Sequence, residues 1–423
     1  MAVCVAMFFG KVNGKRGPMD RRNFLKVMGA STLGLMLSGC GLKSRRDAVA
    51  DDSVDDTGEI TYRTLPHGNI KISTIGIGAS ALHESTPAEL EQLVAYAADR
   101  GINLMDTVMS DFSSAEALGR GMKGRRDKFY LQMHIGATYP NNGYVRTREL
   151  AKVREGFEKQ LKTFGTDYCD FGLIHYVDED ADYDAAINNG LLDYAQQLKQ
   201  AGTIRYIGFS SHSVDISRRF LATGLIDLFM FSLNPAYDFV SPGNGLVIDS
   251  DRKALYEEAQ RRGAAITVMK AYGGSRLLSE ASSPFGRALT PTQCIHYALE
   301  RPAVISCLPG VRNLHDLKSA LLYYKATPEE RDYSFIFGTD RKNMDGVCIY
   351  CGHCQPCRVG IDIAASNKYY DLAQTGDNLA KNHYLKMTKR AGDCIQCGDC
   401  EPRCPFHVKI RERMKETAAY FGK

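Results

Sequence analysis

The chain has 423 residues, of which 44% are hydrophobic and 24% are charged, and this is the composition of an ordinary globular protein. Such a length fits one large domain and one small domain better than a single small module. The formal net charge of +4 is too small to indicate nucleic-acid binding, and no stretch reaches the ~20 consecutive apolar residues of a membrane span.

The N-terminal segment resembles a bacterial twin-arginine export signal. Residues 20–26 read D-R-R-N-F-L-K, and a mildly apolar stretch from Val27 to Gly39 follows that is too short to span a membrane. We therefore expect export across the cytoplasmic membrane; a chance Arg21-Arg22 pair before a core helix is the alternative. The resemblance implies a route for proteins that are already folded. Met19 is a possible true start, because residues 1–18 add nothing recognisable to the signal.

The end of this segment resembles a lipobox. Residues 37–40 read L-S-G-C, which predicts that residues 1–40 are a signal and that Cys40 carries a lipid. The mature protein would then be a membrane-anchored lipoprotein facing the periplasm or the cell exterior. An ordinary small-residue cleavage site is the alternative. Residues 41–59 are acidic and lack apolar periodicity, so they predict a flexible tether.

From residue 60 onward, short apolar runs alternate with amphipathic helical stretches. Expected helices include Thr147 to Phe164, Leu191 to Gln200 and Ser250 to Arg262. Eight strand-helix units predict an α/β fold, a (β/α)8 TIM barrel over residues 60–335, with an open doubly wound sheet as the alternative. The expected strands are Lys71 to Ile77, Ile102 to Asp106, Phe129 to His134, Phe171 to His175, Ile204 to Ser210, Leu228 to Leu233, Ala265 to Lys270 and Val304 to Leu308.

Motifs at the expected strand ends resemble those of the aldo/keto reductase family, in order and in spacing. They are Y-R-T-L at 62–65, G-I-N-L-M-D-T at 101–107, L-I-H at 173–175, I-G-F-S-S at 207–211, V-M-K at 268–270 and L-P-G-V-R at 308–312. Together with the cysteines described below, the chain resembles the branch of that family that carries a C-terminal ferredoxin-type domain.

The resemblance implies an Asp, Tyr, Lys and His tetrad for NADPH-dependent carbonyl reduction, and two of the four members are kept. Asp106 and His175 stand at the expected positions. The tyrosine position, five residues after Asp106, holds Asp111, with Phe112 next, and the lysine position holds His134. Two of the four catalytic roles are therefore vacant or reassigned.

Asp106, His134 and His175 are expected to converge at the barrel mouth, because the corresponding groups of the resembled fold lie within hydrogen-bonding reach. Histidine titrates near neutrality, so His175 or His134 is our candidate to replace the lost tyrosine as general acid. Two histidines and a carboxylate could equally hold a divalent metal ion. A mouth kept only as a scaffold is the third interpretation.

The cofactor-binding positions implied by the resemblance are only partly kept. Ser210-Ser211 stands in place of a serine-asparagine pair, Met230 in place of a glutamine, and Ser319 and Ala320 in place of a Glu-Asn pair. An exported protein would also meet little NADPH. These changes argue against ordinary NADP(H) chemistry. If NADP(H) binds, the candidate residues are Ser210, Ser211, Asn234, Lys270, Gly310 and Arg312.

Four other features have simpler interpretations. His212 either lines the mouth or faces solvent, and the acidic loop from Asp178 to Asp184 is expected to be a solvated surface. Cys169 and Cys307 have no partner at a ligand spacing, so we expect them to be buried small hydrophobic residues.

Eight of the 13 cysteines lie in two runs near the C-terminus, Cys348, Cys351, Cys354 and Cys357, then Cys394, Cys397, Cys400 and Cys404. The second run reads C-x2-C-x2-C-x3-C-P, the pattern of bacterial ferredoxins. It predicts two 4Fe-4S clusters in a small α-helical ferredoxin-like domain, residues 336–423. Zinc sites and a disulfide framework are the alternatives.

The fourth cysteine of such a run often serves the other cluster. We therefore expect one cluster on Cys348, Cys351, Cys354 and Cys404, and the other on Cys394, Cys397, Cys400 and Cys357. The first run has two residues, not three, before Cys357. Its four cysteines could therefore hold a cluster by themselves.

These features together predict an exported iron-sulfur oxidoreductase. Its two clusters would exchange electrons with a small-molecule substrate, or a bound redox cofactor, at the barrel mouth. The other expected partners are a redox protein or a quinone-linked donor, and the membrane through the lipid on Cys40; nucleic acid is not expected. Two other functions stay open, a NAD(P)H-dependent carbonyl reductase with structural clusters and a non-catalytic electron-transfer or binding module.

Overall fold

The computed structural model describes residues 57–109, 111–243, 245–338, 346, 348, 354–374, 378–404 and 407–422. All of them belong to one compact unit, residues 53–423. The predicted export signal, with Arg21, Arg22 and Cys40, lies outside these residues, and so does Cys351. Within the part of the chain that the structure describes, no helix is both long enough and apolar enough to cross a membrane.

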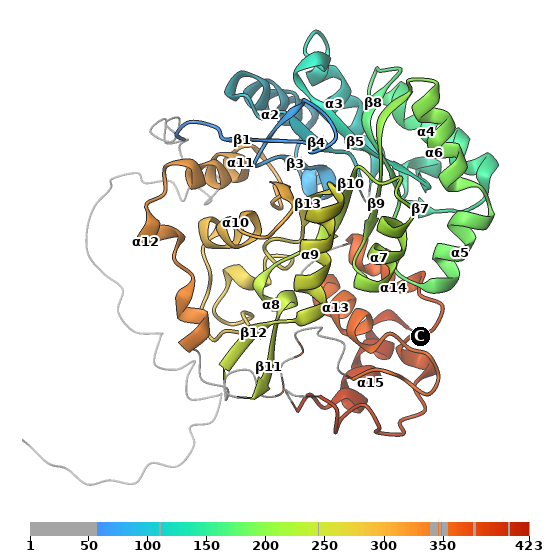
Figure 1. The fold of residues 1–423 in the computed structure, drawn as a ribbon, viewed down its shortest axis with the longest axis vertical. Helices are drawn as coiled ribbons and strands as arrows, with labels where there is room; N and C mark the ends of the chain where they lie inside the picture. Colours follow the sequence, from blue (N-terminus) through green and yellow to red (C-terminus); the bar gives the residue numbers. More distant parts are fainter. Residues whose placement is uncertain are drawn as a thin grey trace, which may run out of the picture. The chain divides into compact units, whose positions relative to one another are not determined.

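Eight parallel strands form one curled sheet at the centre of the fold (Figure 1). Their order is β14 (Val304–Cys307), β13 (Ala265–Met269), β10 (Leu228–Ser232), β9 (Ile204–Ser211), β8 (Cys169–Ile174), β5 (Tyr130–Ile135), β4 (Leu104–Asp106) and β3 (Ile77–Gly78). Backbone bonds bring the two edges of the sheet together: Gly76 N–H donates to the Cys307 carbonyl, and Cys307 N–H donates to the Thr74 carbonyl, both at 2.9 Å. The predicted barrel is confirmed, and the open doubly wound sheet is wrong.

The first expected strand, Lys71 to Ile77, is the one strand that was predicted wrongly, because the segment is divided between two strands. Its beginning is β2 (Lys71–Ser73), which pairs with β1 (Tyr62–Thr64) in an antiparallel hairpin outside the barrel. Its end belongs to β3, which pairs with β4 inside the barrel. All three isoleucines of this segment are fully buried, so hydrophobicity does not mark the place where the chain leaves the hairpin and enters the barrel.

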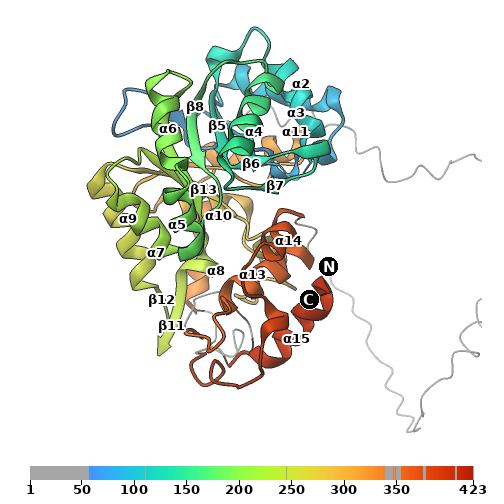
Figure 2. The same ribbon diagram turned by 90° about the vertical axis from the view of Figure 1, so that its right-hand side faces the viewer.

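Helices cover the outer face of the sheet, as α4 and α6 do in Figure 2. The expected helices are confirmed to within a few residues. Gly101, in the left-handed conformation at φ 84°, ends α2, as glycine commonly does at a helix C-terminus. The helices of the barrel region are α2 (Pro87–Arg100), α3 (Ala115–Met122), α4 (Leu150–Thr163), α5 (Asp180–Asn188), α6 (Leu191–Gln200), α7 (Val214–Ala222), α8 (Pro235–Asp238), α9 (Ser250–Arg262), α10 (Pro291–Leu299), α11 (Leu314–Leu321) and α12 (Pro328–Arg331).

Two apolar layers stabilise the barrel. Alternate strand side chains, among them Leu104, Phe171 and Leu228, fill its interior, while the larger core lies between the sheet and the helices. Cys169 and Cys307 are fully buried, which confirms the sequence interpretation. Two short hairpins extend the strand connections, β6 (Ala137–Thr138) with β7 (Val145–Arg146), and β11 (Phe239–Gly243) with β12 (Gly245–Ile248).

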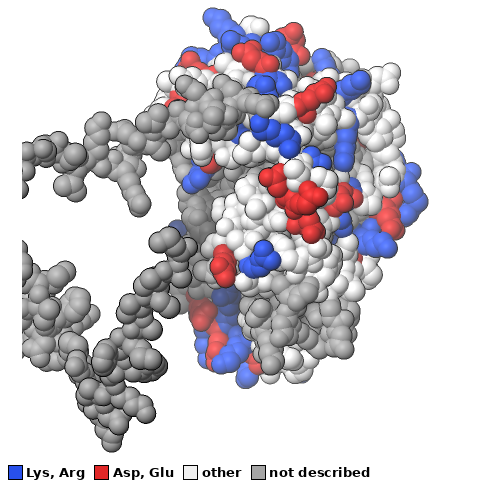
Figure 3. All heavy atoms as spheres, turned by 90° about the vertical axis from the view of Figure 1, so that its left-hand side faces the viewer, with Lys and Arg blue, Asp and Glu red and all other residues white. Residues whose placement is uncertain are grey.

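The C-terminal region is helical, as expected, and packs against one end of the barrel (Figure 2). Its helices are α13 (Ile363–Gln374), α14 (Asn378–Leu385) and α15 (Ile410–Phe421). The rings of Tyr384 and Phe421 stack at 3.9 Å and hold α14 against α15. Asp371 is almost buried and joins this region to the barrel, because it forms ion pairs with Arg276 (2.6 Å) and with Arg413. On the face drawn in Figure 3, basic and acidic side chains alternate, in agreement with the small net charge.

Candidate functional site

The carboxyl ends of the barrel strands surround a cavity of about 270 Å³. This is the end of a TIM barrel at which reactive residues lie. Asp106 ends β4, His134 lies near the end of β5, and His175 directly follows β8, so the three predicted mouth residues share this cavity. All three are at most 2% exposed.

These residues form a hydrogen-bonded chain that includes one member the sequence did not indicate. Asp106 Oδ2 lies 2.7 Å from His134 Nε2, and the Nδ1 atoms of His134 and His175 lie 2.8 Å apart. His175 Nε2 in turn lies 2.6 Å from the hydroxyl of Tyr144. Gln132 holds Asp106, at the other end of this hydrogen-bonded chain, because its side-chain amide donates to Asp106 Oδ2 at 2.6 Å.

The proton positions follow from what each group can donate. The Asp106 carboxylate accepts, so His134 Nε2 carries a hydrogen and, in the neutral ring, His134 Nδ1 accepts from His175 Nδ1–H. His175 Nε2 is then the acceptor for the Tyr144 hydroxyl. Burial, and next the neighbouring His134, hold the pKa of His175 well below its ordinary value, which agrees with a neutral His175 ring. Every donor of this chain points toward Asp106.

Both ring nitrogens of His134 and of His175 are therefore engaged with protein groups. A general-acid role for either histidine stays a prediction, and it requires one of these hydrogen bonds to open toward the substrate. The same engagement disfavours the metal alternative, because a metal ion would need nitrogen lone pairs that the chain already uses.

Tyr144 lies at the end of the β6–β7 connection and is 8% exposed. Burial raises the pKa of its hydroxyl, so this phenol stays protonated and donates. Asp111, at the position where the resemblance implies a tyrosine, is exposed and caps a short helical turn by accepting from Ser113 N–H at 2.9 Å. The phenol of the mouth thus comes from a different segment of the chain.

The residues predicted to bind NADP(H) divide into two groups. Ser210, Lys270, Gly310 and Arg312 line the cavity. Ser211 and Asn234 do not: the Ser211 hydroxyl donates to Asp178 at 3.0 Å, and the Asn234 amide donates to the Lys270 carbonyl at 2.8 Å while its oxygen caps α8.

The C-terminal region closes one side of the cavity, which the sequence did not indicate. Leu379 and His383 of α14 are part of the lining. The His383 ring stacks on the Tyr176 ring at 3.8 Å, with 10° between the planes. From α13, the Tyr369 hydroxyl contacts the Tyr176 hydroxyl (3.0 Å) and donates to Asp178 (2.9 Å).

The expectation of a solvated loop is wrong for Asp178, whose side chain is 11% exposed. It accepts from His212 Nδ1 at 2.9 Å, from Ser211 and from Tyr369. Although burial acts in the opposite direction, His212 and next the positive charge of Lys368 hold the pKa of Asp178 below its ordinary value. His212 lines the cavity with a side chain only 4% exposed, so the solvent-facing alternative for it is wrong.

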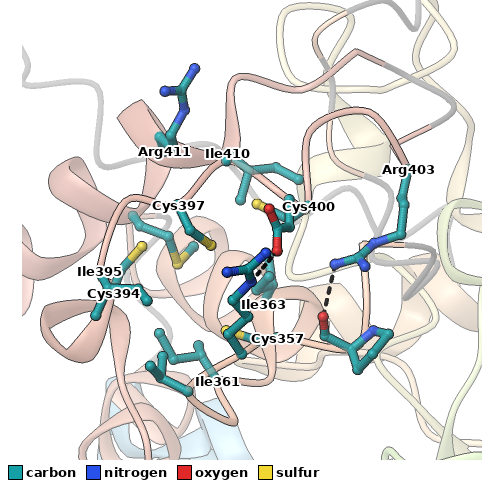
Figure 4. A pocket seen from close by; sticks show the side chains of 16 residues that line it. Cys357, Ile361, Ile363, Cys394, Ile395, Cys397, Cys400, Arg403, Ile410 and Arg411 are labelled. Carbon is teal, nitrogen blue, oxygen red and sulfur yellow. Dashed lines mark hydrogen bonds and ion pairs between the residues drawn. The ribbon is translucent and has the colours of Figure 1, made fainter.

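Four of the cysteines line one space in the C-terminal region (Figure 4). They are Cys394, Cys397 and Cys400 of the second run together with Cys357 of the first, and the apolar side chains of Ile361, Ile363 and Ile410 enclose them. This is the set expected to share one cluster. The sulfur atom of Cys394 also accepts from the Gln396 amide at 3.3 Å, and that of Cys348 from the Asn367 amide at 3.5 Å. Amide donors of this kind suit the thiolate sulfurs of an iron-sulfur cluster.

Comparisons with known proteins agree with this two-part organisation. A model of the aldo/keto reductase family matches residues 74–285, and a model of a 4Fe-4S dicluster domain matches residues 347–409. The chain is 23% identical over 279 residues to the uncharacterized oxidoreductase YqkF of Bacillus subtilis, a match that covers 60% of this chain and 88% of YqkF. It is 26% identical over 178 residues to Schizosaccharomyces pombe aldo-keto reductase yakc, whose printed name includes NADP(+). That match covers 40% of this chain and about half of yakc, 51%.

A solved structure has a similar fold. It is the holo form of aldo-keto reductase AKR11C1 from Bacillus halodurans, with a TM-score of 0.53 and 20% identity. The match covers 66% of this chain and 95% of that one.

Proposed function

Since this chain belongs to the aldo/keto reductase family and carries a 4Fe-4S dicluster domain after its barrel, we propose that it is an exported oxidoreductase whose two clusters exchange electrons with a small molecule bound at the barrel mouth. The catalytic tetrad of the family is altered in this proposal. Asp106 and His175 are kept, His134 replaces the lysine, and Tyr144 contributes a phenol from another position.

When bound, a 4Fe-4S cluster supplies one-electron transfer at a potential that its surroundings set. We assign one cluster to Cys357, Cys394, Cys397 and Cys400, which line one space. The remaining cysteines, Cys348, Cys351, Cys354 and Cys404, would hold the other.

The observation that carries the proposal is that one helix, α13, contacts both a cluster cysteine and the residues that line the cavity. The Asn367 amide contacts the Cys348 sulfur, and Tyr369 lies two residues further along the same helix. Tyr369 contacts Tyr176, and Tyr176 stacks on His383, which lines the cavity. A region with a purely structural role would not need to complete the wall of the mouth.

Reduction of a carbonyl to an alcohol consumes two electrons and two protons, and the mouth contains groups that could move the protons. The chain from Tyr144 through His175 and His134 to Asp106 is fully hydrogen-bonded and buried. Its histidines are the candidates for proton donation to the substrate.

One observation favours NAD(P)H-dependent carbonyl reduction as the second candidate function. Four of the six predicted cofactor residues, Ser210, Lys270, Gly310 and Arg312, line the cavity, and the relative yakc has NADP(+) in its name. In that case the clusters would be structural.

The proposal includes export, a lipid anchor and an external electron donor. Arg21, Arg22 and Cys40 support twin-arginine export and a lipid anchor, and an exported site would receive electrons from a redox protein or a quinone-linked donor.

An anaerobic titration distinguishes the two candidate functions. We expect a low-potential viologen to bleach the cluster absorbance and to drive reduction of glyceraldehyde, and NADPH to do neither. A Cys348→Ser variant should lose viologen-driven turnover, whereas Cys294→Ala, a buried barrel cysteine, should keep it. Brisk NADPH-driven turnover, unchanged in Cys348→Ser, would establish the second candidate instead.

A further inference from the structure

One of the two sets of cluster cysteines lies at the surface of the protein. Cys397 is exposed, and Ile395, two residues before it, is 60% exposed. Both residues line the space that Cys357, Cys394 and Cys400 share with them (Figure 4). A cluster bound in this space, which we call the outer cluster, would lie close to solvent, where another molecule can approach it.

The other set of cysteines is more enclosed and lies next to the helix that reaches the mouth. Cys354 and Cys404 are almost buried, and the sulfur of Cys348 accepts from the Asn367 amide of α13 at 3.5 Å. The two clusters would therefore differ in role. The outer cluster is the one that a partner outside the protein can reach, and the cluster on the other set is the one beside α13.

Basic residues are concentrated in the two segments that carry the cysteines. Residues 348–360 and 389–411 contain six Lys and Arg residues against three Asp and Glu residues, whereas the rest of the chain from residue 57 is slightly acidic. A local excess of one charge attracts a partner of the opposite charge. The six basic residues are Arg358, Lys389, Arg390, Arg403, Lys409 and Arg411.

Three of these arginines line the space of the outer cluster, and Figure 4 shows Arg403 and Arg411 on two sides of its cysteines. Arg358 pairs with Asp399, and Arg411 pairs with Glu401 at 2.8 Å, so the acids beside them are already engaged. Arg403 has no acidic partner among the described residues and donates instead to two backbone carbonyls. The positive excess therefore lies where the outer cluster is exposed.

We propose that Arg358, Ile395, Cys397, Arg403 and Arg411 form a docking face for a small acidic electron-transfer protein. Weak redox complexes bury small interfaces, and their charge complementarity raises the rate of encounter more than the affinity. One exposed isoleucine among arginines suits an encounter of that kind. The use of this docking face in turnover rests on the proposed function.

The electron balance of the encounter is simple. One electron leaves the reduced redox centre of the partner, which is oxidised, and reduces the outer cluster. No bond is made or broken, and no proton is transferred at the docking face. Two such encounters supply the two electrons that reduction of a carbonyl at the mouth consumes.

The test follows the absorbance of the anaerobic full-length holoprotein after rapid mixing with an acidic plant-type [2Fe-2S] ferredoxin. Both starting states are used, reduced ferredoxin with oxidised protein and the reverse, because one of the two directions is downhill whatever the cluster potentials are. We expect a second-order rate constant that falls as the salt concentration rises, since screening weakens the attraction between opposite charges.

Arg358→Glu and Arg411→Glu should each lower this rate constant about three- to tenfold at low salt. The difference from the wild type should vanish near 1 M salt, where the Debye length is about 3 Å. Lys128→Glu is the matched control and should leave the rate constant unchanged. Lys128 also belongs to an exposed ion pair, with Asp99, but it lies at the amino end of β5, whereas the C-terminal helices lie at the carboxyl ends of the strands. Reduction by the methyl viologen radical, which is a cation, should be no slower in any of the three variants.

Equal rate constants for Arg358→Glu, Arg411→Glu and Lys128→Glu, or a rate constant that does not depend on salt, would overturn the docking face. No electron transfer with the ferredoxin in either direction would overturn it as well, and rapid reduction by menadiol in that case would indicate a quinol donor. Arg358→Glu carries the test by itself if Arg411→Glu loses a cluster, as judged by iron content. Electron transfer as expected, without viologen-driven turnover of glyceraldehyde, would support the docking face and contradict the proposed function.

Discussion

The Nδ1 atoms of His134 and His175 lie 2.8 Å apart, a distance at which one of them carries a hydrogen and the other accepts it. With Asp106 at one end and Tyr144 at the other, this contact makes the two rings part of one chain with a single direction of donation. A substitution at either end of the chain should therefore change the hydrogen bonding of both histidines.

We expect Tyr144→Phe to lower viologen-driven turnover roughly two- to tenfold, the usual value of one neutral hydrogen bond. Loss of this donor frees His175 Nε2 for protonation and raises the pKa of His175, so the basic limb of the kcat profile, where a general acid loses its proton, should move to higher pH. Steady-state rates across pH provide the measurement. Tyr139→Phe is the matched control, because this buried hydroxyl contacts Met109 N–H and not His175. Equal profiles for the two variants would remove Tyr144 from the chain.

His175→Ala should lower the viologen-driven rate by about two to four orders of magnitude, the usual contribution of a positioned acid. His134→Lys restores the residue that the family has at that position, yet it should not create NADPH-driven turnover, because Asp111 is exposed at the tyrosine position and the Tyr144 hydroxyl contacts His175 instead of residue 134. Both variants are assayed with each electron donor. Brisk NADPH-driven reduction by His134→Lys would show that the altered tetrad is not what limits nicotinamide chemistry.

Stability should fall as the pH drops below about 6.5, the ordinary histidine pKa in an unfolded chain. His175, His212 and His383 all have lowered pKa values in the fold, so below pH 6.5 the unfolded chain binds more protons than the native one. Each histidine then removes up to about 1.4 kcal/mol per pH unit, for His212 until its pKa of about 4 is reached.

Urea midpoints followed by circular dichroism between pH 7 and pH 5 measure this slope. His212→Asn should make it shallower, because one buried titrating ring is gone. His67→Gln, whose side chain is 51% exposed, should not change it. A wild-type slope of zero would mean that the three rings titrate normally.

Iron and acid-labile sulfide should each approach about eight per chain after anaerobic reconstitution, four for each cluster. Cys357→Ser and Cys394→Ser should remove the same cluster, since both residues line one space. The double variant should then lose no more iron than either single variant, and Cys294→Ala should lose none. Additive iron loss would instead mean that the first run holds its cluster by itself. Zinc at two equivalents without sulfide would exclude the clusters.

Replacing Arg21 and Arg22 by lysine should leave the precursor in the cytoplasm, and Cys40→Ala should permit export while abolishing lipid labelling. Both follow from the resemblance of residues 20–40 to a twin-arginine lipoprotein signal. Cell fractionation and labelling with a fatty-acid analogue provide the measurements. Membrane attachment that survives Cys40→Ala would rule out the lipid anchor.

Local patterns in the sequence were sufficient for the barrel and for part of its mouth. Strand-helix alternation depends on neighbouring residues, so the barrel could be predicted from it. The resemblance to the aldo/keto reductase family implied that Asp106, His134 and His175 converge at its mouth. The cysteine spacing is local in the same sense and indicated a dicluster domain. The one misplaced strand, Lys71 to Ile77, lies where buried isoleucines continue across two elements.

Only the tertiary structure decided which further groups reach the cavity. Tyr144 comes from a connection between short strands, and Tyr369 meets Tyr176 across 193 positions of sequence. His383 reaches the mouth only because the C-terminal helices pack against the barrel. The same region contacts Asp178, which was expected on a solvated surface, and His212, for which the sequence left both positions open. Such contacts depend on the docking of distant segments, and no periodicity or spacing within one segment records which side chains from two segments will meet.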